Sequence, residues 1–88
     1  MSQKTRLRTV SRVLMQHWDP AGVRGVPQAA DEYDDAARAV LSLLRANASV
    51  AEIAKRLRRY EHEDMGLETD GGSAMRAAEI IVNRRDHN

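Results

Sequence analysis

Four carboxylates within five residues are the first candidates for chemistry. They are Asp31, Glu32, Asp34 and Asp35. Carboxylate oxygens are ligands that Mg²⁺ prefers, so a small metal-dependent enzyme is one hypothesis. No second acidic segment with matching spacing completes a ligand set, and acids at a helix start also offset the positive end of its dipole. We therefore expect helix capping or partner contact here rather than metal binding.

Other residue types that catalyse reactions form no recognisable pattern. His17, His62 and His87 match no HExxH motif or other ligand spacing, and no serine lies in a GxSxG turn. The chain has no cysteine, which excludes disulfides, thiolate metal sites and cysteine nucleophiles. The sequence thus predicts no catalytic residue, no bound metal and no cofactor.

Basic side chains form two groups that a nucleic-acid-binding regulator would use to contact phosphates. They are Lys4, Arg8 and Arg12 in the first predicted helix and Lys55, Arg58 and Arg59 in the third. Residues 49–57 also resemble the first helix of a helix-turn-helix unit, but the helical pattern continues through residues 58–62, where such a unit would turn. The net charge of +1 indicates no dominant nucleic-acid-binding field. Nucleic-acid binding is therefore the second function hypothesis, and nucleic acid is not the expected partner.

The only tryptophan stands in the run Trp18-Asp19-Pro20. Trp is enriched at the hot spots of protein interfaces. At the end of an amphipathic helix, however, a lone Trp more often covers the core, with its indole N–H bonded to a carbonyl, and we favour that position. Asp19 is expected to make an Asx-type turn and Pro20 to end the helix.

Helices must position these residues, because apolar side chains recur at three- and four-residue steps through most of the chain. The pattern predicts helices at about 3–18, 31–47, 49–65 and 73–85 and no strands. We expect an all-α fold in one domain over residues 1–88. It would be a small compact bundle of three core helices and a fourth, with an ordered connector between the first two.

Local signals predict the ends of these helices. Asp31 is expected to cap the second helix, with Asp34 at the third position of a capping-box-like pair, and Ser49 with Glu52 predicts a capping box for the third. Gly66 is typical of the residue just beyond a helix end. The inward candidates of the fourth helix are Met75, Ala78, Ile81 and Val82.

Three motifs resemble the YugE-like family of small bacterial domains of unknown function. They are the Trp-Asp-Pro turn at 18–20, the Gly-Val step at 22–23 and the Asp-Glu-Tyr-Asp run at 31–34. The resemblance covers residues 13–67 and implies a small all-helical domain with short antiparallel helices, but it supplies no catalytic residue. The chain departs from the family pattern at residues 63–66, where relatives tend to carry aromatic side chains.

Composition and the motifs together favour a binding domain. Charged residues make up 31% of the chain at a net charge of +1, a balance that argues against disorder. No apolar run approaches the roughly 20 residues that span a bilayer, and no secretory signal is evident, so we expect a cytoplasmic protein without membrane contact. We expect a noncatalytic adaptor or immunity-like domain that binds an unidentified protein. A homodimer is a further way for so small a core to gain buried area. The predicted contact surface comprises Trp18, Asp19, Asp31, Glu32, Asp34 and Asp35.

Overall fold

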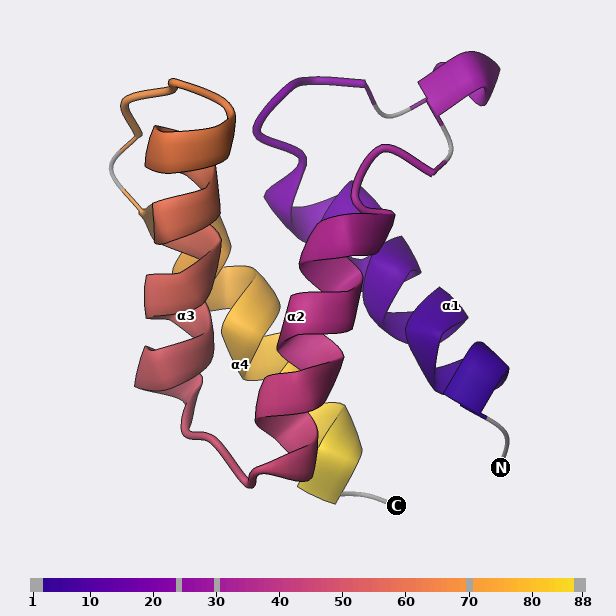
Figure 1. The fold of residues 1–88 in the computed structure, drawn as a ribbon, viewed down its shortest axis with the longest axis vertical. Helices are drawn as coiled ribbons and strands as arrows, with labels where there is room; N and C mark the ends of the chain where they lie inside the picture. The colour runs from indigo at the N-terminus through magenta and orange to yellow at the C-terminus, as the bar shows by residue number, and fades with distance from the viewer. Residues whose placement is uncertain (1–2, 24, 30, 70, 87–88) are drawn as a thin grey trace.

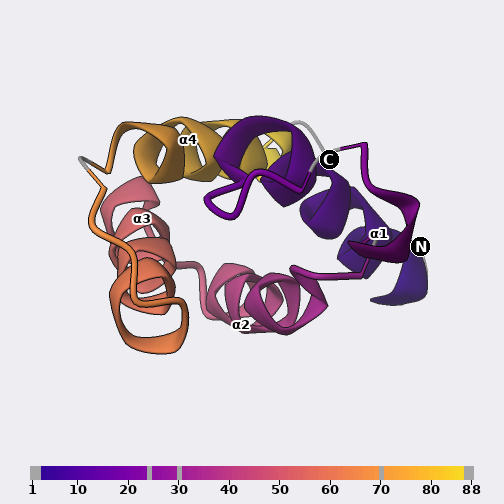
Figure 2. The ribbon, with the colours of Figure 1, turned by 90° about the horizontal axis from the view of Figure 1, so that it is seen from above.

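The computed structural model describes residues 3–23, 25–29, 31–69 and 71–86. Its helices are α1 (Gln3–Val13), α2 (Asp34–Arg45), α3 (Val50–Arg59) and α4 (Gly72–Asp86) (Figure 1). They surround a common centre, and the connector between α1 and α2 lies at one end of the bundle (Figure 2). The described residues include no strand, which confirms the all-α prediction. No helix in these ranges has the length and apolar character to cross a membrane.

Two of the helices continue as short π-helical segments. Leu14–Trp18 extends α1, and Tyr60–Asp64 extends α3. Beyond the first segment, Asp19 adopts the left-handed conformation at φ 32°, and its N–H donates to the Leu14 carbonyl at 2.9 Å. The two helices thus end within about a residue of the positions predicted for them, but their last turns are wider than α-helical turns.

The start of α2 differs from the prediction. Residues 31–33 form turns, the helix begins at Asp34, and its N-cap residue is Tyr33, which makes no side-chain cap hydrogen bond. Asp31 is not the N-cap because the N–H it would cap, that of Asp34, already donates to the Asp31 backbone carbonyl at 3.1 Å. The Asp34 carboxylate in turn accepts a hydrogen bond from the Ser11 hydroxyl of α1 at 2.8 Å. The Asp34 carboxylate therefore takes part in a contact between helices rather than in a local cap.

The start of α3 follows the prediction. The Glu52 N–H donates to the Ser49 hydroxyl oxygen at 3.2 Å, and the Ser49 N–H donates to the Glu52 carboxylate at 3.4 Å, which completes the capping box. At the other end, Gly66 has φ +64°. This left-handed conformation suits glycine at the first position past a helix end.

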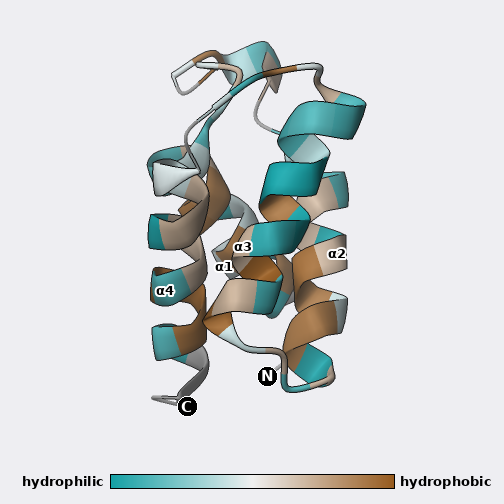
Figure 3. Ribbon diagram, turned by 90° about the vertical axis from the view of Figure 1, so that its left-hand side faces the viewer, coloured by the Kyte–Doolittle hydropathy of each residue, from teal (hydrophilic) through white to brown (hydrophobic). Residues whose placement is uncertain are grey.

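Apolar residues from all four helices form the core. Hydrophilic residues alternate with them along the helices, as the hydropathy colours of the ribbon show (Figure 3). In α4 the buried stripe runs through Ala74, Ala77, Ala78 and Ile81, with Val82 beside it. The prediction is thus confirmed for three of its inward residues, Ala78, Ile81 and Val82, but it is wrong for Met75, whose side chain is 41% exposed. The small alanines occupy the core face and allow close helix approach, while Met75 lies one residue, or about 100° around the helix, from Ala74.

Candidate functional site

Trp18 lies in the core, where it is 3% exposed. Its ring packs against Tyr33 at 5.1 Å and Tyr60 at 5.7 Å between centroids. Its indole N–H donates to Glu61 Oε2 at 2.6 Å. The core position is therefore the correct interpretation, but the acceptor is a carboxylate rather than a carbonyl. Trp18 does not belong to the accessible contact surface, because its apolar ring is enclosed by other aromatic side chains.

Glu61 is the functional-looking residue that sequence reasoning missed. It is fully buried, and its second oxygen accepts a hydrogen bond from the Thr69 hydroxyl. One carboxylate thus joins the end of α1, the end of α3 and the loop before α4. A signal existed, because Glu61 follows Leu57 by four residues and so continues the buried stripe of α3. Both oxygens are occupied and shielded from solvent, which indicates a structural rather than a chemical role.

Asp19 shapes the connector. Its Oδ1 accepts hydrogen bonds from the Val23 N–H at 2.9 Å and from the Tyr33 hydroxyl at 2.7 Å. The Ala21 N–H donates to the same tyrosine hydroxyl at 3.0 Å. Burial and the hydrogen bond to Asp19 raise the pKa of Tyr33 above its ordinary value. Asp19 therefore organises a local turn, as expected, and also clamps that turn to the residue that precedes α2.

The acidic cluster does not gather into one site. Asp34 is half-buried against Ser11, Asp35 pairs with Arg38 at 2.9 Å, and Asp31 and Glu32 are exposed. Within the described ranges, no three His, Asp or Glu side chains lie close enough together to hold a metal ion. The metal-enzyme hypothesis thus has no ligand set among these residues.

The two basic groups lie on separate sides of the bundle, since α1 and α3 are on opposite sides in both views (Figures 1 and 2). Arg8, Arg12 and Lys55 are exposed, whereas the side chain of Lys4 lies outside the described part of the structure. Arg59 pairs with Glu63 at 2.6 Å, and Arg58 Nη2 donates to the Thr69 carbonyl at 3.4 Å. The basic side chains therefore do not form one continuous track for a nucleic-acid backbone.

Histidines add no further site in the described ranges. His62 is exposed and His17 is half-buried. His87 lies outside the described residues.

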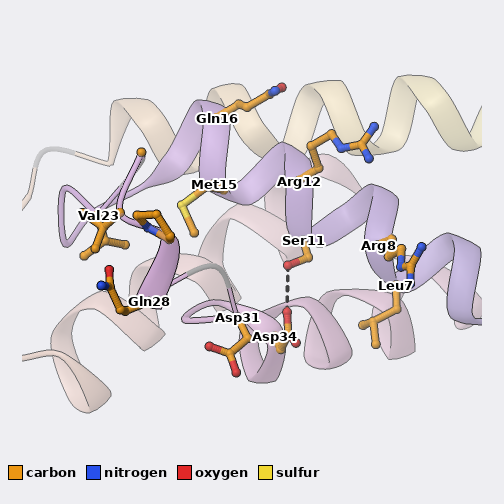
Figure 4. Close-up of a pocket in the computed structure, with 13 residues that line it drawn as sticks. Leu7, Arg8, Ser11, Arg12, Met15, Gln16, Val23, Gln28, Asp31 and Asp34 are labelled. Atoms are coloured by element: carbon orange, nitrogen blue, oxygen red, sulfur yellow. Dashed lines mark hydrogen bonds between the residues drawn. The ribbon is translucent and has the colours of Figure 1, made fainter.

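A groove of about 1090 Å³ lies between α1 and the connector (Figure 4). We call it the α1–connector groove. Its lining residues are Leu7, Arg8, Ser11, Arg12, Met15 and Gln16 on one side and Val23, Gly25, Val26, Pro27, Gln28, Asp31 and Asp34 on the other. The hydrogen bond between Ser11 and Asp34 spans its base (Figure 4). Of the predicted contact residues, Asp31 and Asp34 thus line the groove. Asp19 accepts a hydrogen bond from Val23 in the connector wall, and Trp18 lies in the core.

No protein-family model, curated protein or solved structure matches the chain.

Proposed function

We propose that the protein is a noncatalytic protein-interaction domain that binds its partner in the α1–connector groove. The observation that carries the proposal is the combination of apolar and charged side chains in this groove. Val26 is 44% exposed there. Leu7, Met15 and Arg8 line the α1 wall of the groove, and Asp31 lies on the other wall. Apolar surface bordered by charged side chains is typical of a protein-binding site.

The groove is held in shape by contacts that lie beneath it. Asp19 and Tyr33 clamp the connector, and Ser11 ties α1 to Asp34 at the start of α2. A surface that is ordered before binding loses less conformational entropy when the partner arrives. The clamp therefore supports a role in recognition for a connector that is otherwise rich in turns.

Part of the contact surface expected from the sequence is retained in this proposal. Asp31 and Asp34 line the groove, whereas the exposed Glu32 and Asp35 are not among its lining residues. An adaptor or immunity-like role in the cytoplasm suits such a domain, and a relationship to the YugE-like family is part of the same proposal. That relationship contributes no activity.

The test compares two glutamate substitutions at apolar positions of similar exposure. Val26 in the groove is 44% exposed, and Met75 on α4 is 41% exposed. The intact protein, Val26→Glu and Met75→Glu are each used as bait in a lysate of the source organism. The intact protein and Met75→Glu should retain a partner that binds in the groove. Val26→Glu should retain at least tenfold less of that partner.

Both variants should keep the unfolding midpoint of the unaltered protein, because each changes a largely exposed side chain. Equal retention of every captured protein by Val26→Glu and Met75→Glu would show that the groove is not the binding surface.

A further inference from the structure

We infer that the occupant of the α1–connector groove is a short amphipathic helix of a partner protein, with acidic residues along the edge that faces Arg8 and Arg12. This inference rests on the proposed function and adds the chemistry of the partner. Three features of the groove carry it: the hydrogen bonds of its backbone, the spacing of the α1 side chains and the placement of charges.

The backbone of the groove walls favours a helix over an extended segment. One wall is α1, whose N–H and C=O groups bond within the helix. In the other wall, the Val26 N–H donates to the Val23 carbonyl and the Ala29 N–H to the Val26 carbonyl, each at 3.0 Å, and Pro27 has no N–H. Neither wall is a strand, so neither has a regular row of edge groups with which an added strand could pair. A helix bonds its own backbone groups and so suits this groove better.

The spacing of side chains on α1 matches the surface of another helix. Leu7, Ser11 and Met15 line the groove at four-residue steps and so form one ridge. Eight residues of helix correspond to about 12 Å, which is roughly two turns of an occupant. Apolar side chains at positions i, i+3 or i+4, and i+7 of that occupant would contact this ridge.

The charged side chains of the groove determine which edge of the occupant helix should be acidic. Arg8 and Arg12 form the neighbouring ridge, are exposed, and make no ion pair with a described residue. Residues four apart on a helix lie about 6 Å from each other, so two acidic residues at the same spacing in the occupant complement them. Asp31 is exposed on the opposite wall and disfavours a second acidic edge through like-charge repulsion.

A displayed library of helix-forming peptides tests the inference. The peptides are roughly 16 residues long, since shorter helices are marginal in water, and they are selected on the intact protein. We expect enriched peptides to carry an apolar stripe flanked by two acidic residues at i, i+4 spacing. Their affinity should fall at least tenfold on Arg8→Glu/Arg12→Glu. The affinity of the same peptides for the control variant Lys55→Glu/Arg76→Glu should stay within about twofold of that for the unaltered protein. This control changes the net charge by the same amount as Arg8→Glu/Arg12→Glu, but through exposed residues of α3 and α4.

The outcomes separate this inference from the proposed function. If enriched peptides lose binding on Val26→Glu but carry no acidic pair, or contain proline and no helical periodicity, the groove binds a partner but the occupant inferred here is wrong. If no enriched peptide depends on Val26, the inference is overturned, and the bait comparison above then decides independently whether the groove binds any protein.

Discussion

Glu61 joins three segments through a single carboxylate. Replacement by alanine removes both acceptors and leaves the Trp18 indole N–H without a partner in the core. The lost hydrogen bonds and the resulting cavity should lower the free energy of unfolding by about 2–4 kcal/mol. Glu61→Gln should cost only about 1 kcal/mol, because its carbonyl can still accept from Trp18 and its amide can donate to Thr69. Chemical denaturation measures the change in unfolding free energy for both variants. An unchanged unfolding midpoint for Glu61→Ala would contradict a structural role of Glu61.

Tyr33 couples the connector to the core and should make stability depend on alkaline pH. Burial and the hydrogen bond to Asp19 raise the pKa of Tyr33 above the ordinary value of 10.0. The folded state then holds the phenol proton more tightly than the unfolded chain does. The stabilisation is complete below pH 10 and declines as the pH rises further.

Tyr33→Phe tests this coupling. It removes the hydroxyl that bonds Ala21 and Asp19 and should cost about 1–2 kcal/mol at neutral pH. It should also flatten the decline in stability above pH 10. Tyr60→Phe is the control, because burial raises the pKa of Tyr60 as well but it has no comparable pair of hydrogen bonds among the described residues. Equal effects of the two substitutions would argue against the clamp.

Individual residues show where sequence reasoning stops. The burial of Trp18 and the turn at Asp19 follow from local patterns, because the helical period and the proline act on adjacent residues. Glu61 was missed because it begins an acidic run, Glu61 to Asp64, that is typical of solvent-exposed helix. Its burial depends on two polar partners, and those come from segments that are distant along the chain.

At the scale of the elements, the capping box of α3 gives a direct prediction. Ser49→Ala removes the oxygen that accepts from the Glu52 N–H and should lower the free energy of unfolding by about 1 kcal/mol. Ser42→Ala is the matched control, because Ser42 is exposed within α2, where alanine is the better helix former. Thermal or urea unfolding should therefore rank Ser49→Ala below Ser42→Ala, and the reverse order would contradict the cap.

The start of α3 was predictable because its cap is local, whereas the start of α2 was not, because a contact with α1 occupies the carboxylate of Asp34. The Ser49 and Glu52 pair lies three residues apart, so its signal is present in the sequence. At α2 the carboxylate of Asp34 contacts Ser11, 23 residues away along the chain, and no local rule anticipates that bond. The buried face of α4 was also hard to predict from the apolar pattern. Alanine is compatible with a buried or an exposed face, so the larger apolar residue Met75 was assigned to the buried face.

At the scale of the whole molecule, the fold class was predictable because helical periodicity extends along nearly all of the chain. The groove was not predictable, since it arises where residues 7–16 meet residues 23, 25–28, 31 and 34, and that meeting depends on the path of the connector. The sequence did place two acidic residues of the groove, Asp31 and Asp34, in the expected contact surface. It did not indicate that Met15, Val26 and Arg12 line the same groove.

Amide hydrogen exchange of the protein with its captured partner locates the surface to which the partner binds. If the partner occupies the α1–connector groove, it should slow exchange in residues 7–16, 25–28 and 31–34, while α3 and α4 exchange as in the free protein. Slower exchange confined to α3 and α4, with the groove residues unchanged, would show that the partner binds elsewhere.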